Sequence, residues 1–245
     1  MVSKNQIKTI TALQQKKYRK EQKMFFAEGV KVIEELLNSN FELQQLYTTI
    51  DVFKNVPKSR ITIINEEELK KISALTTPNA CLAVFKTADE KPLEDNGLIV
   101  ALDEVRDPGN LGTIIRLCDW FGIKHLVCSN GCADIYNPKV VQATMGSVAR
   151  VNVVYTNLTQ YLENTSLPVY GTFMDGQNIY SKDLPEKGIV VMGNEANGIS
   201  VEIESLCAER ISIPRFGDLQ QTESLNVATA SAIILSEFRR NFSGK

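Results

Sequence analysis

Short apolar runs alternate with polar, amphipathic runs along the first ninety residues of the chain. The apolar runs predict strands and the amphipathic runs predict helices. The acidic stretch after Asn65 predicts a helix that this asparagine caps, because its side chain accepts free amide groups of the first turn. This part of the chain is therefore predicted to be a small α/β domain. Its predicted strands are residues 25–27, 43–47, 61–64 and 81–85, and its other predicted helix is residues 30–38.

From residue 97 onward the apolar runs become continuous and are separated by helical patterns. Continuous apolar strands that alternate with helices are typical of a parallel sheet with both faces covered. In such sheets, ligands bind beyond the carboxyl ends of the strands. The predicted strands are residues 97–105, 124–128, 151–154, 169–173, 188–192 and 211–213, and the predicted helices are residues 111–121, 138–149, a segment around Tyr161, and 227–235.

A polar stretch separates these two patterns. Residues 86–97 contain a proline and lack the periodicity of a helix or a strand. Such a composition is typical of a connection between domains. We therefore expect a first domain at residues 1–90, a linker at 91–96 and a second domain at 97–245.

The last predicted helix differs from the others because it is apolar almost all round. A helix of this kind is predicted to be buried, although chain ends usually lie at the surface. The polar residues Ser224 and Asn226 at its start are then expected to face a site. The apolar positions are Val227, Ala228, Ala230, Ala232, Ile233, Ile234 and Leu235.

Charge is unevenly distributed, although the net charge is only −2. Residues 1–90 hold 14 basic and 11 acidic side chains, a net charge of +3, whereas residues 91–245 hold 13 and 18, a net charge of −5. Seven of the basic side chains lie within the first 23 residues. Such a cluster favours contact with phosphate groups, and the alternative interpretation is a solvated helix face. The residues considered for RNA binding are Lys16, Lys17, Arg19, Lys20 and Lys23.

Several common kinds of site find no support in the sequence. The only histidine, His125, is not accompanied by a GxSxG motif of the serine hydrolases,. Cys128 and Cys132 lack the second pair of ligands that a zinc site needs. Walker-type and GxGxxG phosphate-binding loops are absent as well. We therefore expect no metal. The five cysteines, with no signal-peptide core and no apolar run of membrane-spanning length, predict reduced thiols in a cytoplasmic protein that does not enter a membrane,.

Polar, glycine-containing loops follow four of the predicted strands. The helix after Asp107 carries Arg116, so its free amide groups and this guanidinium are candidates for binding an anion. Glu195, which lies between Gly193 and Gly198, is expected to lie close to the interior and to need a partner for its charge. One such loop is explained equally well by turn chemistry, but several at one sheet edge favour a site. The loops read DEVRDPGNLG, SNGCADIYNP, GNEANGIS and PRFGDLQQTESLN.

Together these segments resemble the motifs of the SpoU (TrmH-like) group of SPOUT methyltransferases. NLGTIIRLCDWFG at residues 110–122 resembles the family pattern N-x-G-x-x-x-R-x-x-x-x-F-G, and VVMGNEANGIS at 190–200 resembles G-x-E-x-x-G. The third motif is IPRFG followed by SLNVATASAIILSE, and VQATMGSVARVNV matches the run usual between the first two. The resemblance covers about residues 97–240. Residues 1–90 are similar to the appended substrate-binding domain of many members, with a local match at Phe26-x-Glu28-Gly29.

The resemblance implies a trefoil-knotted α/β fold with the C-terminal helix tucked through a loop, and a homodimer that packs near this helix. It also implies methyl transfer from S-adenosylmethionine to a ribose 2′-hydroxyl of RNA, with the cofactor held largely by backbone groups. The residues implied for catalysis are Arg116, Asn110, Glu195 and Asn226, and those implied for cofactor binding are Met192, Gly193, Ile213, Ser224 and Leu225.

Other interpretations remain open on the sequence. One is a catalytically silent RNA-binding module, against which the intact polar residues of the three motifs argue. Another is a base-methylating SPOUT relative, although Ser224-Leu225-Asn226 with Arg116 favours ribose. A third is an α/β enzyme that does not act on RNA, which the missing nucleophile makes less favourable. The RNA is expected to be ribosomal or transfer RNA. The chain also departs from the family pattern, since six residues rather than three separate Gly217 from Ser224, and Arg215 replaces a common Met.

Overall fold

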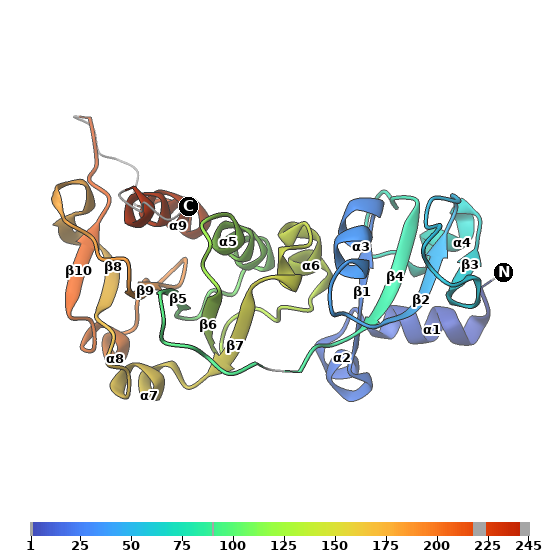
Figure 1. Cartoon of the computed structure of the whole chain (residues 1–245), viewed down its shortest axis with the longest axis horizontal. Coiled ribbons are helices and arrows are strands. Elements are labelled where there is room, and N and C mark those ends of the chain that lie inside the picture. The colour runs from blue at the N-terminus through green and yellow to red at the C-terminus, as the bar shows by residue number, and fades with distance from the viewer. Residues whose placement is uncertain (1, 90, 218–223, 241–245) are drawn as a thin grey trace. The chain divides into compact units, whose positions relative to one another are not determined.

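The computed structural model describes residues 2–89, 91–217 and 224–240, which divide into two compact units (Figure 1). The first unit comprises residues 1–89 and 134–149, and the second comprises residues 90–133 and 150–245. The segment 134–149, which the sequence places inside the second domain, thus packs with the first unit. Among the described residues, none of the helices has both the length and the apolar character needed to cross a membrane.

The first unit is built on a mixed sheet with strand order β1-β4-β2-β3. β4 runs antiparallel to both of its neighbours, and β2 and β3 are parallel. Asn65 caps α4 as predicted, because its side chain accepts the amide of Glu68 while the Glu68 carboxylate accepts the amide of Asn65,. The strands are β1 (Met24–Glu28), β2 (Leu43–Thr48), β3 (Ile61–Ile63) and β4 (Cys81–Lys86), and the helices are α1 (Lys4–Ala12), α2 (Lys16–Gln22), α3 (Val30–Leu37), the 3-10 helix η1 (Lys58–Arg60), α4 (Glu66–Ile72), α6 (Pro138–Thr144) and the 3-10 helix η2 (Ser147–Ala149).

Side chains of this sheet point alternately into two separate cores. Phe25 of β1 and Phe85 of β4 pack on one face, whereas Phe26 packs on the other face with Leu82. This alternation follows from the two-residue period of a strand. Because both faces are apolar, the sheet of this small unit is covered on each side.

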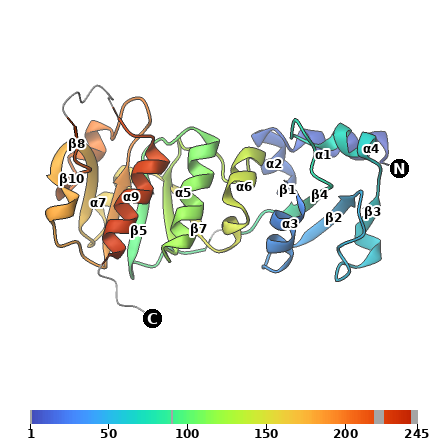
Figure 2. The same ribbon diagram turned by 90° about the horizontal axis from the view of Figure 1, so that it is seen from above.

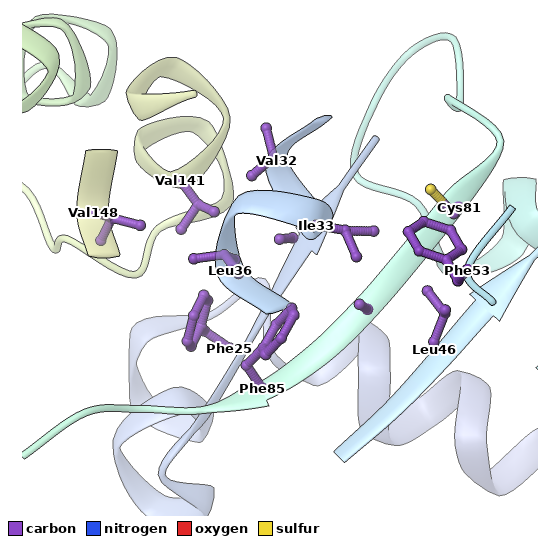
Figure 3. Packing of buried hydrophobic residues seen from close by; sticks show 12 residues of the cluster. Phe25, Val32, Ile33, Leu36, Leu46, Phe53, Cys81, Phe85, Val141 and Val148 are labelled. Atoms are coloured by element: carbon purple, nitrogen blue, oxygen red, sulfur yellow. The ribbon is translucent and has the colours of Figure 1, made fainter. Parts of the chain in front are cut away.

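The segment 134–149 completes the first of these cores (Figure 3). Val141 and Val148 project toward Leu36 of α3, in the same cluster as Phe25. Gly146 has a φ of +95°, and a Cβ atom there would lie 2.5 Å from the Cβ of Glu35. Only glycine fits this close approach, so the segment is seated against α3 by its shape as well as by its apolar side chains.

The second unit is built on a parallel sheet with strand order β10-β8-β9-β5-β6-β7. Helices α5 and α9 cover one face and α7 and α8 cover the other (Figure 1). The strands are β5 (Leu98–Leu102), β6 (His125–Ser129), β7 (Asn152–Thr156), β8 (Val169–Asn178), β9 (Gly188–Met192) and β10 (Glu209–Ser212), and the helices are α5 (Pro108–Trp120), α7 (Leu158–Glu163), the 3-10 helix η3 (Ile179–Ser181), α8 (Val201–Glu204) and α9 (Val227–Arg239).

The central strands β5 and β9 are buried along their whole length. Ile99 and Ile189 point toward the face of α7 and α8, where Leu158 and Ile203 meet them. The prediction of a parallel sheet with both faces covered is therefore confirmed. The sheet could be predicted because a strand that is covered on both sides has no polar face and therefore reads as a continuous apolar run.

The helix α9 lies beside α5 (Figure 2), and its burial within one chain is less complete than the sequence predicts. Its buried residues recur at helical spacing and form one stripe, whereas Ala230, Ala232 and Ile233 are only half-buried. Within one chain α9 is therefore amphipathic, and the chain alone covers only one side of the helix that the sequence predicts to be buried all round. The buried stripe consists of Val227, Ala228, Ser231, Ile234, Leu235 and Phe238.

Candidate active site

Three polar side chains form a continuous hydrogen-bonded chain where β5, β9 and β10 lead into their following segments. Asn226 donates from Nδ2 to Oδ1 of Asn110 at 2.9 Å, and Asn110 donates from Nδ2 to Oε1 of Glu195 at 2.9 Å. These residues lie 85 and 116 positions apart in sequence. The structure thus brings together one residue from each of the three motifs.

Asn110 is positioned by the first turn of α5. Asp107 caps this helix by accepting the backbone amide of Asn110 at 2.8 Å, and Pro108 occupies the first helical position. Proline suits this position because its fixed φ is helical and the missing amide has no helical partner there. The carboxamide of Asn110 is therefore carried on a well-formed helix start at the sheet edge.

Asn226 is the N-cap of α9, and this role sets the orientation of its carboxamide. Its Oδ1 accepts the backbone amides of Ala228 at 2.9 Å and Thr229 at 3.2 Å. Because the oxygen faces the helix, the Nδ2 group is directed away from it and toward Asn110. One side chain thus both starts the helix and joins the site.

Glu195 is carried by a tight loop that closes on itself. Asn194 and Gly198 exchange two backbone hydrogen bonds of 2.8 and 2.9 Å, and the Asn194 side chain accepts the amide of Ala196. A Cβ atom at Gly193 would lie 2.3 Å from the carbonyl carbon of Gly198. Gly198 has a φ of +71°. Both glycines are therefore required by the backbone path.

The environment of Glu195 differs from the sequence prediction. Its side chain is exposed rather than close to the interior. Solvent and the Asn110 carboxamide solvate the carboxylate, so it needs no buried cationic partner. Glu195 is thus accessible for contact with a bound molecule.

Glu104 lies in the first loop and connects it to the second and third loops, a role that the sequence does not predict. It has a φ of +56°, which is uncommon for a residue other than glycine,. Its amide donates to Oγ of Ser129 at 2.9 Å, and its carbonyl accepts Nδ2 of Asn194 at 2.7 Å. These bonds hold the left-handed backbone in place. A glutamate gives no sequence signal for such a position, because positive φ is enriched in Asn, Asp and Gly.

Arg116 is not part of the hydrogen-bonded chain. Its side chain is exposed and makes no hydrogen bond or ion pair with the described residues. Arg116 follows Asn110 by six residues on α5, so the two side chains point in directions about 120° apart around the helix axis, given 3.6 residues per turn. The guanidinium is therefore available to a molecule outside this chain.

The residues implied for cofactor binding lie at the ends of β9 and β10 and at the start of α9. Met192 is buried, Gly193 and Ile213 are half-buried, and Ser224 and Leu225 are exposed. The longer stretch between Gly217 and Ser224 lies outside the described residues. These positions offer apolar walls and strand-end backbone groups rather than charges.

A bulge in β8, which the sequence does not predict, lies between these two strand ends. β10 pairs with Gly171 and then with Gln177, so residues 172–176 have no partner on β10. Thr172 donates from Oγ1 to the carbonyl of Val191 at 2.9 Å, and Met174 is 55% exposed. Because β8 lies between β9 and β10 in the sheet, the bulge lies next to the ends of both strands.

The basic cluster near the N-terminus separates into two kinds of residue. Lys16, Lys17, Lys20 and Lys23 are exposed, but Arg19 is 3% exposed. Arg19 donates to Oδ2 of Asp134 at 2.6 and 3.0 Å and to the carbonyls of residues 13 and 14. The expectation that Arg19 binds RNA is therefore wrong, because its guanidinium is buried and already paired within the first unit.

Other reactive groups are structural in the described residues. His125 is buried, its Nδ1 accepts Nδ2 of Asn152 at 3.2 Å, and burial lowers its pKa. The five cysteines are free thiols, and burial raises the pKa of Cys81 and Cys118 to about 12. A thiol with such a pKa is a poor nucleophile. No group of three or more His, Cys, Asp or Glu side chains suited to a metal occurs in the part of the chain that is described.

Comparison with known families gives two matches along the chain. The sequence profile of the SpoU rRNA Methylase family matches residues 97–236. The profile of the MRM3-like substrate binding domain matches residues 4–83. The two matches leave out residues 84–96, which include the predicted linker, and a few residues at each end of the chain.

Individual relatives match nearly the whole chain. The 23S rRNA (guanosine(2553)-2′-O)-methyltransferase RlmP of Bacillus subtilis is 30% identical over 248 residues, which cover 97% of each chain. A TrmH-family structure from Porphyromonas gingivalis is 41% identical with a TM-score of 0.87, covering 98% of this chain and 99% of that one. An AdoMet-bound rRNA methyltransferase structure from Sinorhizobium meliloti is 30% identical with a TM-score of 0.87, covering 100% and 98%.

Proposed function

This chain belongs to the SpoU rRNA methylase family, and we propose that it transfers a methyl group from S-adenosylmethionine to a ribose 2′-hydroxyl of ribosomal RNA. The observation that carries the proposal is the chain of hydrogen bonds from Asn226 through Asn110 to Glu195. A silent RNA-binding module would have no need to keep three distant side chains in this arrangement. The AdoMet bound by the Sinorhizobium meliloti relative supports the choice of cofactor.

The residues present fit this cofactor. Ile213 and Leu225 offer partly exposed apolar surface, and Met174 of the β8 bulge adds to it. The strand ends beside them supply backbone N–H and C=O groups, which suit a nucleoside that needs shape and hydrogen bonds rather than counter-charges. When bound, S-adenosylmethionine supplies an activated methyl group on a sulfonium.

The side chains of the site have separate roles in this proposal. A ribose hydroxyl is a weak nucleophile until its proton is lost or shared. A guanidinium is a poor proton acceptor, so we assign Arg116 the role of an electrostatic clamp. It aligns an RNA phosphate, which takes the hydroxyl proton, and stabilises the negative charge that develops on the 2′-oxygen. The exposed carboxylate of Glu195, held by Asn110, orients the ribose through its hydroxyl groups.

Replacing Arg116 with Ala is expected to reduce methyl transfer by at least 100-fold, because preorganised charge stabilisation of this kind contributes about 10²–10³ in rate. Binding of S-adenosylmethionine, measured by calorimetry, should stay unchanged since Arg116 lies outside the implied cofactor wall. Arg116→Lys is the matched control, because it keeps the charge but loses the planar fork. It should recover only part of the activity. Near-normal turnover by Arg116→Ala would refute the assignment.

We further propose that the first unit holds the RNA backbone. Its match to a substrate-binding domain and its four exposed lysines support this role. Lysine ammonium groups on one short segment neutralise phosphates without reading sequence. The lysines are Lys16, Lys17, Lys20 and Lys23.

We also propose that the protein is a cytoplasmic homodimer with a trefoil knot, as the family resemblance implies. The half-exposed side of α9 supports a dimer, since Ala230, Ala232 and Ile233 leave apolar surface uncovered in one chain,. The free cysteines support a reducing compartment,. Light scattering of the wild-type protein should give twice the chain mass of 27.3 kDa, and a mass of one chain would contradict the dimer.

A further inference from the structure

Two exposed aromatic side chains lie near each other at the same sheet edge as the candidate active site. Phe216 is 82% exposed and Tyr180 is 39% exposed. Their ring centroids are 6.5 Å apart and the rings are tilted by 31°. A core pair with a similar tilt, Phe25 and Tyr136, is packed at 4.7 Å. The exposed pair is thus tilted by a modest angle and is not closely packed.

Both rings lie just after strands that end at this sheet edge. Phe216 follows β10 and lies three residues after Ile213, a residue of the implied cofactor wall. Tyr180 lies in η3, directly after β8, which pairs with β10. The fully buried Ile179 anchors η3, and the side chain of Asn178 accepts the amide of Tyr180. The position of Tyr180 is therefore fixed independently of any ligand.

The chemistry of such a pair suits a flat, partly polar ring. A single exposed apolar side chain needs no explanation, but two neighbouring rings beside a site, tilted by only 31°, both offer stacking surface. Stacked bases lie about 3.4 Å apart, so two rings with one base between them are about 7 Å apart, close to the separation of this pair. Sequence-specific RNA recognition uses aromatic side chains in this way on bases that have left the helical stack.

We propose that Tyr180 and Phe216 form a stacking site for an unpaired base of the RNA substrate, next to the nucleotide that is methylated. The proposal rests on the proposed function and narrows its substrate class to RNA in which this base is unstacked, such as a loop or a bulge. The pair would act as a specificity-determining element, since a base inside a continuous duplex has no free face to offer.

The test is equilibrium binding of ribosomal RNA from cells that lack this gene, measured by filter binding with the full-length protein. Phe216→Ala and Phe216→Leu should weaken binding about ten-fold, because Leu keeps apolar bulk but loses the ring. Phe216→Trp should bind within about three-fold of wild type. The KM for RNA should rise in parallel for Ala and Leu, while the affinity for S-adenosylmethionine and the unfolding midpoint stay unchanged.

Trp120 provides a matched control, because it is 84% exposed and lies at the other end of α5 from Asn110. Trp120→Leu should leave RNA affinity unchanged. The proposal is overturned if Phe216→Leu binds RNA like wild type. It is also overturned if Phe216→Ala loses cofactor affinity or halves the mass in light scattering, because the ring then belongs to the cofactor pocket or to a contact between chains. Wild-type protein that binds RNA without methylating it would refute only the proposed function, and the binding comparison would still decide the stacking site.

Discussion

Arg19 and its lysine neighbours show how one charge pattern divides into two roles at the scale of single residues. The sequence presents five basic side chains in close succession. Four remain exposed, whereas the Arg19 guanidinium is buried against Asp134, more than one hundred residues away. Because that partner is distant in sequence, local charge alone cannot separate the structural cation from those available to RNA.

Charge reversal of the exposed lysines is expected to weaken RNA binding and flatten its salt dependence, since each lost phosphate contact removes about 0.7–0.9 from the slope of log K against log salt. The folded state should be little affected. Arg19→Met should instead lower the free energy of unfolding by about 2 kcal/mol, because it removes the charged hydrogen bonds between the buried guanidinium and the half-buried Asp134 carboxylate,. Filter binding and urea unfolding of both variants provide the comparison. Arg19→Met that unfolds like wild type but fails to bind RNA would reverse the assignment. The varied lysines are Lys16, Lys17, Lys20 and Lys23.

Part of the candidate site could be predicted from the sequence, residue by residue. Asn110, Glu195 and Asn226 could be named from their motifs, and the structure joins them. The exposure of Glu195 could not be predicted, because it depends on how its loop closes. Glu104 could not be found either, since its positive φ is imposed by partners on other loops, including Asn194.

At the scale of elements, helix starts were easier to predict than the surroundings of each helix. The N-cap of α4 followed from local hydrogen-bonding chemistry, and the start of α9 followed from the onset of its apolar residues. The burial of α9 could not be predicted in the same way, because a helix that is apolar on all sides gives no indication of which side the rest of the chain covers. The β8 bulge was missed for a related reason, since register is visible only once the partner strand is known,.

Asn226→Ala tests whether the cap of α9 also serves the site. Loss of the cap should lower the free energy of unfolding by about 1 kcal/mol, and loss of the bond to Asn110 should reduce turnover at least ten-fold. Asn157 is the matched control, because it caps α7 by accepting the amide of Gln160 and makes no bond to the site. Asn157→Ala should cost similar stability and leave turnover unchanged. Equal losses of turnover in both variants would mean that stability alone explains the effect.

At the scale of the whole molecule, the two-part organisation and the parallel sheet could be predicted because both follow from composition and hydrophobic continuity. The sequence could not predict which of the two units residues 134–149 join. Their helical pattern is the same whichever core they join, and the decision comes from long-range contacts such as Val141 with Leu36 and Asp134 with Arg19. A segment from between two sheet strands of the second unit thus stabilises the first unit.

The central claim is that this chain methylates a ribose 2′-hydroxyl of ribosomal RNA with S-adenosylmethionine. The most direct test is ribose-methylation mapping of total RNA from cells with and without the gene. We expect a 2′-O-methylated nucleotide of ribosomal RNA to disappear with the gene and to be restored when purified protein and S-adenosylmethionine are added to the unmethylated RNA. An unchanged ribose map, or a methyl group found on a base after digestion to nucleosides, would contradict the account.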